Sequence, residues 1–192
     1  GTGLDLQGAA SLLAASGYGP NGKPLTITAT IVSGDTDLSL VTTSLKSNLA
    51  KLTITLDVQA VQWQAQWDKA KSSDVAKRQD VFLMYWWPDY ADPFSWFMSL
   101  FHSEKTPNFN LAYNSSKTLD AEIDGIQALT ATNRDQAAAQ YVTMQQQLID
   151  DAVVVVPYVQ NYQRVLQASV GGFVDNPAYA QGVFVYDLTP GP

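Results

Sequence analysis

Residues 85–94 form the densest set of side chains that could bind a ligand. This acidic aromatic segment holds five aromatic residues and two aspartates, and Pro88 and Pro93 stiffen it. A stiff segment loses less conformational entropy when a ligand binds. A carboxylate accepts a charge-assisted hydrogen bond from an ammonium group, worth about 1.5–3 kcal/mol, and aromatic rings add cation–π or stacking energy. The segment therefore favours a site for a cation or for the face of a ring.

Two other interpretations of the segment stay open. Trp86 and Trp87 could pack in the core while Asp89 and Asp92 cap turns or the following helix, and the spacing alone does not decide. The two carboxylates could also be the acid and base of a glycosidase. They are only three residues apart on one loop, however, whereas that chemistry needs them on opposite sides of the bond that is cleaved. A carboxylate-based hydrolase is therefore the weaker alternative.

Composition excludes several other classes of site. The 192 residues include no cysteine and one histidine, His102, which excludes thiolate catalysis, thiolate zinc sites and imidazole clusters. We predict no metal ion and no cofactor, and we interpret His102 as a helix-end residue. Asp35-Thr36-Asp37 resembles half of an oxygen-ligand metal loop, but helix capping explains it better. With 18 acidic and 11 basic residues the net charge is -7, which argues against nucleic acid as a partner.

The elements that lead to the segment follow an α/β pattern. Helical periodicity covers residues 6–14, 38–52 and the pair Trp63 and Trp67, whereas strand patterns cover residues 25–32, 53–58 and 80–86. The last of these strands is apolar on both faces, which predicts a mostly parallel sheet with helices on both sides. Open α/β sheets bind ligands at the carboxyl ends of their strands, and the acidic aromatic segment begins at this end.

The second half of the chain is predicted to be helical and then extended. Helices are expected over residues 94–101, 116–129 and 133–150, a buried strand over 152–159 and a shorter strand over 164–168. The Gly171-Gly172 pair predicts a turn. The tail beyond Phe173 carries prolines among aromatic residues, which suits a segment that packs against another surface. We find neither a membrane-spanning run nor a signal peptide.

Ten short motifs occur along the chain, and their order is informative about its family. They occupy residues 12–18, 49–54, 61–63, 86–93, 100–103, 113–115, 119–120, 149–152, 156–158 and 171–173. Their succession resembles the C-terminal half of the family 5 extracellular solute-binding proteins, which are the peptide, dipeptide and nickel receptors of bacterial ABC importers. The resemblance covers nearly the whole chain.

This resemblance implies one lobe of a two-lobed receptor with a type II periplasmic-binding-protein-like fold, a mixed, mostly parallel sheet with helices on both faces. Residues 1–161 would form the ligand-binding lobe, and residues 162–192 the hinge and the C-terminal tail that returns to the missing N-terminal lobe. The expected function is non-catalytic capture of a solute, with an oligopeptide as the first choice and an oligosaccharide or another non-peptide solute as the alternative. The expected partner is the importer's membrane permease. The expected location is the extracellular face of the membrane or the periplasm, with any signal or lipid anchor outside this chain.

Family members also imply roles for single residues. In the peptide-binding members, the aspartate of a Trp-x-x-Asp-Tyr motif pairs with the free α-amino group of the ligand, and here the motif supplies Trp86 and Asp89. The predicted ligand-binding residues are Asp89, Trp86, Trp87, Tyr90, Tyr85 and Asp35. The aromatic residues would wall the ligand, and the loop over residues 33–37 would line the cleft. Trp87 and Pro88 are bulkier and stiffer than in many members, and residues 69–79 form a longer loop, which keeps the non-peptide alternative open.

Overall fold

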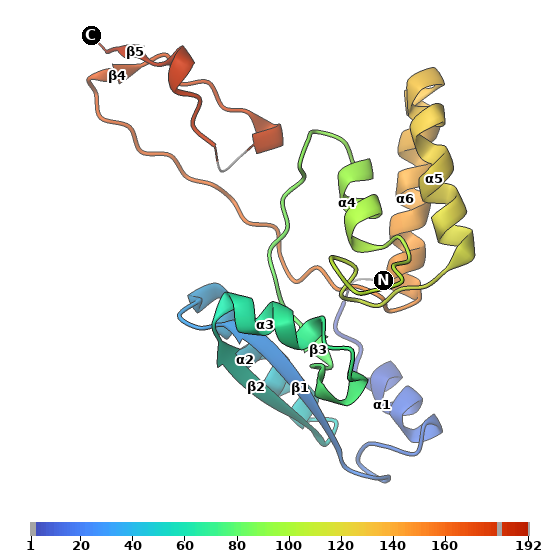
Figure 1. Ribbon diagram of the computed structural model, residues 1–192. Coiled ribbons are helices and arrows are strands. Elements are labelled where there is room, and N and C mark those ends of the chain that lie inside the picture. The colour runs from blue at the N-terminus through green and yellow to red at the C-terminus, as the bar shows by residue number, and fades with distance from the viewer. Residues whose placement is uncertain (1–2, 180–181, 192) are drawn as a thin grey trace. The chain divides into compact units, whose positions relative to one another are not determined.

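The computed structural model describes residues 3–179 and 182–191, and this part of the chain divides into two compact units (Figure 1). Unit 1 comprises the described residues up to Trp86 together with Glu104–Tyr113. Unit 2 comprises Trp87–Ser103 and the described residues from Asn114 onward. The acidic aromatic segment therefore contributes its first two residues to unit 1 and the rest to unit 2.

Unit 1 is built on a three-stranded parallel sheet in the order β2-β1-β3. Its elements are α1 (Leu6–Ala15), β1 (Leu25–Val32), α2 (Thr36–Ala50), β2 (Ile54–Val61), α3 (Trp63–Ala70), the 3-10 turn η1 (Val75–Lys77) and β3 (Val81–Phe82). The β1–β2 register runs from Leu25 opposite Ile54 to Val32 opposite Val61. The parallel sheet predicted from the sequence is confirmed.

Helices cover both faces of this sheet. On one face, Ala29 and Ile31 of β1 pack against Leu38 of α2. On the other face, Phe82 of β3 packs against Trp67 of α3, with ring centroids 5.4 Å apart. Successive side chains of a strand point to opposite faces, so an apolar run of this kind needs a cover on each side. The predicted two-sided cover is confirmed.

Two polar side chains and one glycine determine where elements of unit 1 begin or end. Asp35 caps α2 by accepting the backbone N–H of Leu38 at 2.8 Å, as one of the two predicted caps. Gly17 follows α1 with a φ of +81°, a left-handed conformation that favours glycine and ends the helix. The strand predicted over residues 80–86 pairs only at Val81–Phe82. Beyond it the Gln66 side chain donates to the carbonyls of Thr30 and Leu83, at 3.0 and 2.8 Å, and so takes up backbone acceptors where the ladder ends.

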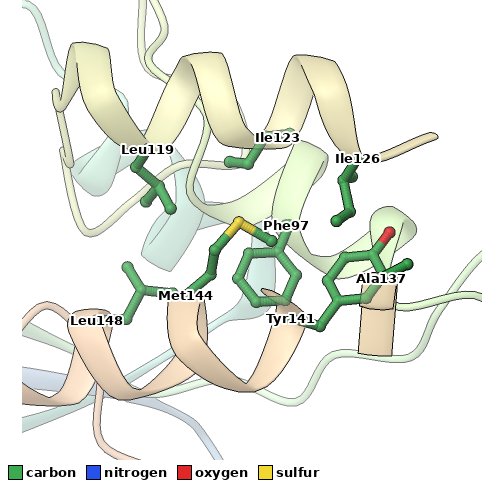
Figure 2. Close-up of a cluster of buried hydrophobic side chains, with 8 residues drawn as sticks. All are labelled: Phe97, Leu119, Ile123, Ile126, Ala137, Tyr141, Met144 and Leu148. Carbon is green, nitrogen blue, oxygen red and sulfur yellow. The ribbon is translucent and has the colours of Figure 1, made fainter. Parts of the chain in front are cut away.

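Unit 2 gains its core from three helices, α4 (Phe94–Leu100), α5 (Lys117–Thr132) and α6 (Arg134–Asp150). Their apolar side chains recur every three or four residues and meet between the helices, as Figure 2 shows. The buried cluster consists of Phe97, Leu119, Ile123, Ile126, Ala137, Tyr141, Met144 and Leu148. Ser116 and Asn133 cap α5 and α6. All three predicted helices are confirmed to within a few residues. None of the helices in residues 3–179 and 182–191 combines the length and hydropathy that a membrane span requires.

Two predicted strands of unit 2 are wrong. Residues 152–159 form no strand: Val153 and Val154 pack on the helical core, whereas Val155 and Val159 are each 81% exposed. Residues 164–168 are likewise extended and belong to no strand of the described residues (Figure 1). The reason is that, among the described residues, no neighbouring strand pairs with either segment. The strand pairing in this unit joins β4 (Val170–Gly171) with β5 (Thr189–Pro190), next to the predicted glycine turn. The short 3-10 turns η2 (Pro177–Tyr179) and η3 (Val185–Asp187) complete it.

Candidate functional site

The predicted ligand-binding residues fall into two groups, one in each unit. Unit 1 holds Asp35, Tyr85 and Trp86, and unit 2 holds Trp87, Asp89 and Tyr90. Within unit 1, the structure joins Asp35 to Tyr85. Within unit 2, it places Asp89 beside residues of α4 and of the C-terminal tail, as described below.

Asp35, one of the predicted ligand-binding residues, makes contacts that stabilise the fold. Its Oδ1 accepts the Tyr85 hydroxyl at 3.2 Å and the Leu38 backbone N–H at 2.8 Å. The capping interpretation of Asp35 is therefore confirmed, and the same contact connects the end of the β3 segment to the start of α2. An open hollow of about 410 Å³ borders this point. It is lined by Gly34, Asp35, Thr36, Ser39, Leu40 and Thr43, which include part of the loop predicted to line the cleft.

Trp86 belongs to an aromatic cluster on unit 1. Its ring meets Phe109 edge to face, with centroids 5.3 Å apart, and Phe109 in turn meets Trp67 at 5.9 Å. Trp86 is half-buried, so the core interpretation of this residue holds in part. Its Nε1 is buried and donates to no acceptor among the described residues. An indole N–H in this state is a hydrogen-bond donor that a ligand or a further part of the protein can satisfy.

Phe109 is a candidate wall residue that sequence reasoning missed. Its side chain remains 40% exposed although it contacts Trp86. The carboxylate of Glu104 holds this loop by accepting the backbone N–H groups of Asn108, Phe109 and Asn110, at 2.6, 3.2 and 3.2 Å. No local pattern links Phe109 to Trp86, because the contact depends on residues 104–113 returning to unit 1.

Asp89 is exposed, and its backbone is fixed from two sides. Its N–H donates to Ser95 Oγ at 2.9 Å, and its carbonyl oxygen accepts the Tyr179 hydroxyl at 3.4 Å. The Ser95 hydroxyl also lies 3.4 Å from Asp89 Oδ2. Sequence reasoning missed both partners, since neither Ser95 nor Tyr179 belongs to a motif that points to Asp89.

The two aromatic neighbours of Asp89 leave much of their rings open. Trp87 is 43% exposed and Tyr90 is 44% exposed, so the core interpretation of Trp87 is wrong. The Trp87 indole N–H donates to the Tyr162 hydroxyl at 2.6 Å, which holds the ring. Desolvation, followed by the negative charges of Asp92 and Asp89, raises the pKa of Tyr90. The neutral hydroxyl can donate a hydrogen bond.

The Asp92 carboxylate has a structural role, because it connects two helices of unit 2. Its Oδ1 accepts the backbone N–H of Phe94 at 2.8 Å and the Tyr141 hydroxyl at 3.2 Å, which fixes the start of α4 against α6. The capping interpretation is thus confirmed for Asp92. A glycosidase needs both carboxylates to act on the scissile bond, whereas the Asp92 carboxylate is hydrogen-bonded within the fold. The arrangement favours binding through Asp89 over the hydrolase alternative.

The Tyr141–Asp92 contact predicts a stability change at alkaline pH. Burial, together with the charge of Asp92, raises the pKa of Tyr141 from 10.0 to about 12. The folded state therefore holds this proton more tightly than the unfolded state, so stability present below pH 10 should be lost as the pH rises towards 12. Tyr141→Phe should flatten this decline and cost about 1 kcal/mol at neutral pH for the lost hydrogen bond.

Urea unfolding at several pH values, followed by circular dichroism, measures this effect. Tyr186→Phe is the matched control, since that ring is 96% exposed, and it should leave the pH dependence as in the parent chain. An identical decline in the parent and in Tyr141→Phe would show that Tyr141 does not carry the effect.

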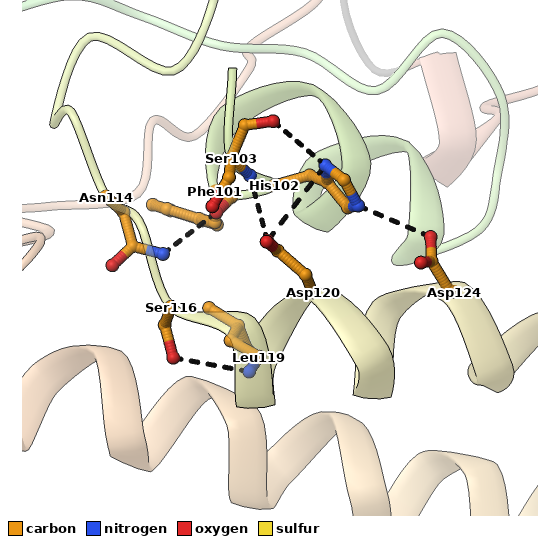
Figure 3. Close-up of polar contacts among 8 residues, drawn as sticks. All are labelled: Phe101, His102, Ser103, Asn114, Ser116, Leu119, Asp120 and Asp124. Atoms are coloured by element: carbon orange, nitrogen blue, oxygen red, sulfur yellow. Dashed lines mark hydrogen bonds and ion pairs between the residues drawn. The ribbon is translucent and has the colours of Figure 1, made fainter. Parts of the chain in front are cut away.

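His102 joins the end of α4 to α5 (Figure 3). Its Nε2 lies 3.3 Å from Asp124 Oδ1 and its Nδ1 lies 4.0 Å from Asp120 Oδ1. Asp120 also accepts the Ser103 backbone N–H at 2.9 Å. The helix-end interpretation of His102 is confirmed. Across the part of the chain that the structure describes, no three side chains of the metal-binding types gather into a site.

Comparison with solved structures shows that the chain has the fold of periplasmic binding proteins. The murein tripeptide binding protein MppA of Escherichia coli aligns with a TM-score of 0.76 at 21% identity, over 96% of this chain and 34% of its own. A periplasmic oligopeptide-binding protein of Thermotoga maritima, solved with bound mannohexaose, aligns with a TM-score of 0.62 at 18% identity. That alignment covers 78% of this chain and 30% of the other. The predicted fold class is confirmed.

Sequence comparison then identifies the family. The pattern described as "Bacterial extracellular solute-binding proteins, family 5 Middle" matches residues 2–108. The chain belongs to this family, which confirms the resemblance seen in its motifs. The "Probable D,D-dipeptide-binding periplasmic protein DdpA" of Escherichia coli (strain K12) is 29% identical over 161 residues, which are 83% of this chain and 30% of that protein. The chain thus spans about a third of the length of the relatives it matches.

Proposed function

We propose that this chain is one lobe of the solute-binding receptor of a bacterial ABC importer, and that the receptor captures an oligopeptide between this lobe and a second one. Residues 1–161 form the ligand-binding lobe, and residues 162–192 cross the hinge and return to the other lobe. The receptor acts at the extracellular face of the membrane or in the periplasm and delivers its ligand to the membrane permease.

The exposed carboxylate of Asp89, in a chain of this family, is the observation that carries the proposal. Trp87 and Tyr90, which lie near it in the sequence, are each more than two-fifths exposed. A peptide supplies an ammonium group for the carboxylate and apolar side chains for the rings. The names of DdpA and MppA, which describe peptide binding, agree with this choice of ligand.

The exposed apolar residues after α6 support a second lobe. Val155 and Val159 are each 81% exposed, and Val165 is 98% exposed. They lie on extended backbone that forms no ladder within the described residues. Such a segment is a ready template for pairing with another strand. Because the relatives are about three times as long as this chain, the remainder of the receptor is the partner we propose for it.

An oligosaccharide is the second candidate ligand. Trp87 and Tyr90 are exposed on unit 2, and Trp63 and Phe109 are exposed on unit 1, by 46% and 40%. Flat rings of this kind also suit the faces of sugar rings. The similar structure from Thermotoga maritima was solved with mannohexaose. A neutral sugar gives the Asp89 carboxylate no cation to pair with, which is why we place the peptide first.

The complete receptor, purified without added ligand, provides the test. Mass spectrometry of the small molecules released on denaturation should identify peptides with free amino termini. Oligosaccharides in their place would support the second candidate. Release of neither, together with no binding across a broad library of peptides and sugars, would contradict solute capture and favour a structural role.

A further inference from the structure

The Ser95 hydroxyl contacts Asp89 at two points. Its oxygen accepts the Asp89 backbone N–H at 2.9 Å, and it lies 3.4 Å from Asp89 Oδ2. A serine hydroxyl has one hydrogen to donate and two lone pairs with which to accept. Because the backbone N–H occupies a lone pair, the hydroxyl hydrogen is available for the carboxylate. One side chain thus holds both the backbone and the acid group of Asp89.

Ser95 itself is held rigidly and kept away from water. Its side chain is only 3% exposed, so solvent does not compete for the hydroxyl hydrogen. It lies in the first turn of α4, where its backbone N–H donates to the carbonyl of Asp92 at 3.2 Å. Asp92 is in turn fixed by Phe94 and Tyr141. The exposed Asp89 is therefore connected through Ser95 to the buried core of unit 2.

We propose that Ser95 is a positioning residue for Asp89, which orients the carboxylate for the ammonium group of the ligand. This inference rests on the proposed function, in which Asp89 anchors a free α-amino group. The hydroxyl binds Oδ2 and leaves Oδ1 open to the ligand. A carboxylate that is already oriented loses less rotational freedom on binding, so its contact with the ammonium contributes more to affinity.

Ser95→Ala in the complete receptor tests the inference. The measurement is the dissociation constant for a tripeptide with a free amino terminus and for its N-acetylated form, and the readout is the ratio of the two. We expect this amine selectivity to fall about 3- to 10-fold, because one hydrogen bond to a charged group is lost. If Ser95 has a purely structural role, the variant should weaken the binding of both peptides equally and leave the ratio unchanged. That result would overturn the inference.

Ser116→Ala is the matched control. Ser116 also accepts a backbone N–H in unit 2, that of Leu119 at 3.3 Å, and it caps α5. Its loss should lower the thermal midpoint without a change in amine selectivity. A fall in selectivity as large as that of Ser95→Ala would show that general loosening of unit 2 explains both results.

Asp89→Asn separates the inference from the function on which it rests. If Asp89→Asn abolishes amine selectivity and Ser95→Ala leaves it intact, the positioning role alone is wrong. If Asp89→Asn leaves selectivity intact, the amine anchor itself is wrong and the positioning role fails with it. In the Asp89→Asn background, Ser95→Ala should cause no further change in the ratio, because no charged group remains to be oriented.

Discussion

Asp89→Asn in the complete receptor should weaken the binding of peptides with a free α-amino group by about 10-fold or more. A charge-assisted hydrogen bond contributes about 1.5–3 kcal/mol, and 1.4 kcal/mol corresponds to a factor of ten in affinity. The variant keeps the size of the side chain and its contact with Ser95 while it removes the negative charge. Titration calorimetry with a free tripeptide and its N-acetylated form measures the effect, and the acetylated form should change little.

Asp135→Asn is the control for net charge. Asp135 lies exposed in the first turn of α6, also in unit 2. Its replacement by Asn removes the same charge and leaves the acidic aromatic segment unchanged. This variant should bind the free and the acetylated peptide with the same affinity as the parent receptor. Equal losses for the free and acetylated peptides in Asp89→Asn, or no loss for either, would contradict the anchoring role.

The fold follows from the sequence where local signals and packing agree. Helices α5 and α6 carry apolar residues every three or four positions, and Leu119, Ile123 and Met144 are indeed buried. In unit 1, the apolar residues 81–86 alternate between two covered faces, which is why a run without periodicity still predicted a parallel strand.

The same reasoning fails where an element depends on a partner. Residues 152–159 have the composition of a buried strand, but a strand exists only if another strand supplies its hydrogen bonds. Composition indicates the tendency of a segment to form a strand, but it does not indicate whether the chain contains a second strand with which that segment can pair. The exposure of Val155 and Val159 is therefore the expected result for a strand-like sequence without a neighbour among the described residues.

The candidate site was predictable only in part for a related reason. Clustering of acids and rings in residues 85–94 singled out Asp89, Trp87 and Tyr90, which are all exposed. Sequence spacing did not distinguish the open Asp89 from the committed Asp92, because that difference depends on Tyr141 of α6. Ser95 and Phe109 were missed since their contacts arise from the path of the chain and from no motif.

The isolated 192-residue chain should bind peptides far more weakly than the complete receptor. If the receptor binds with micromolar affinity, its binding free energy is about -8.2 kcal/mol, and a lobe that makes half of the contacts is left near -4.1 kcal/mol, or millimolar. The loss is therefore about 1,000-fold. The exposed rings of Trp87 and Tyr90 agree with a surface that has only one side of its ligand covered.

Titration calorimetry on the isolated chain, with the complete receptor measured in parallel, decides the matter. We expect almost no heat from the isolated chain at peptide concentrations that saturate the receptor. Circular dichroism should first show that α4, α5 and α6 are formed, because their core is contained within unit 2 and does not need a second lobe. A micromolar signal from this folded chain would mean that the site is complete within one lobe. The ligand would then be held by Asp89 and its neighbours without closure, and the two-lobed mechanism would have to be abandoned for this protein.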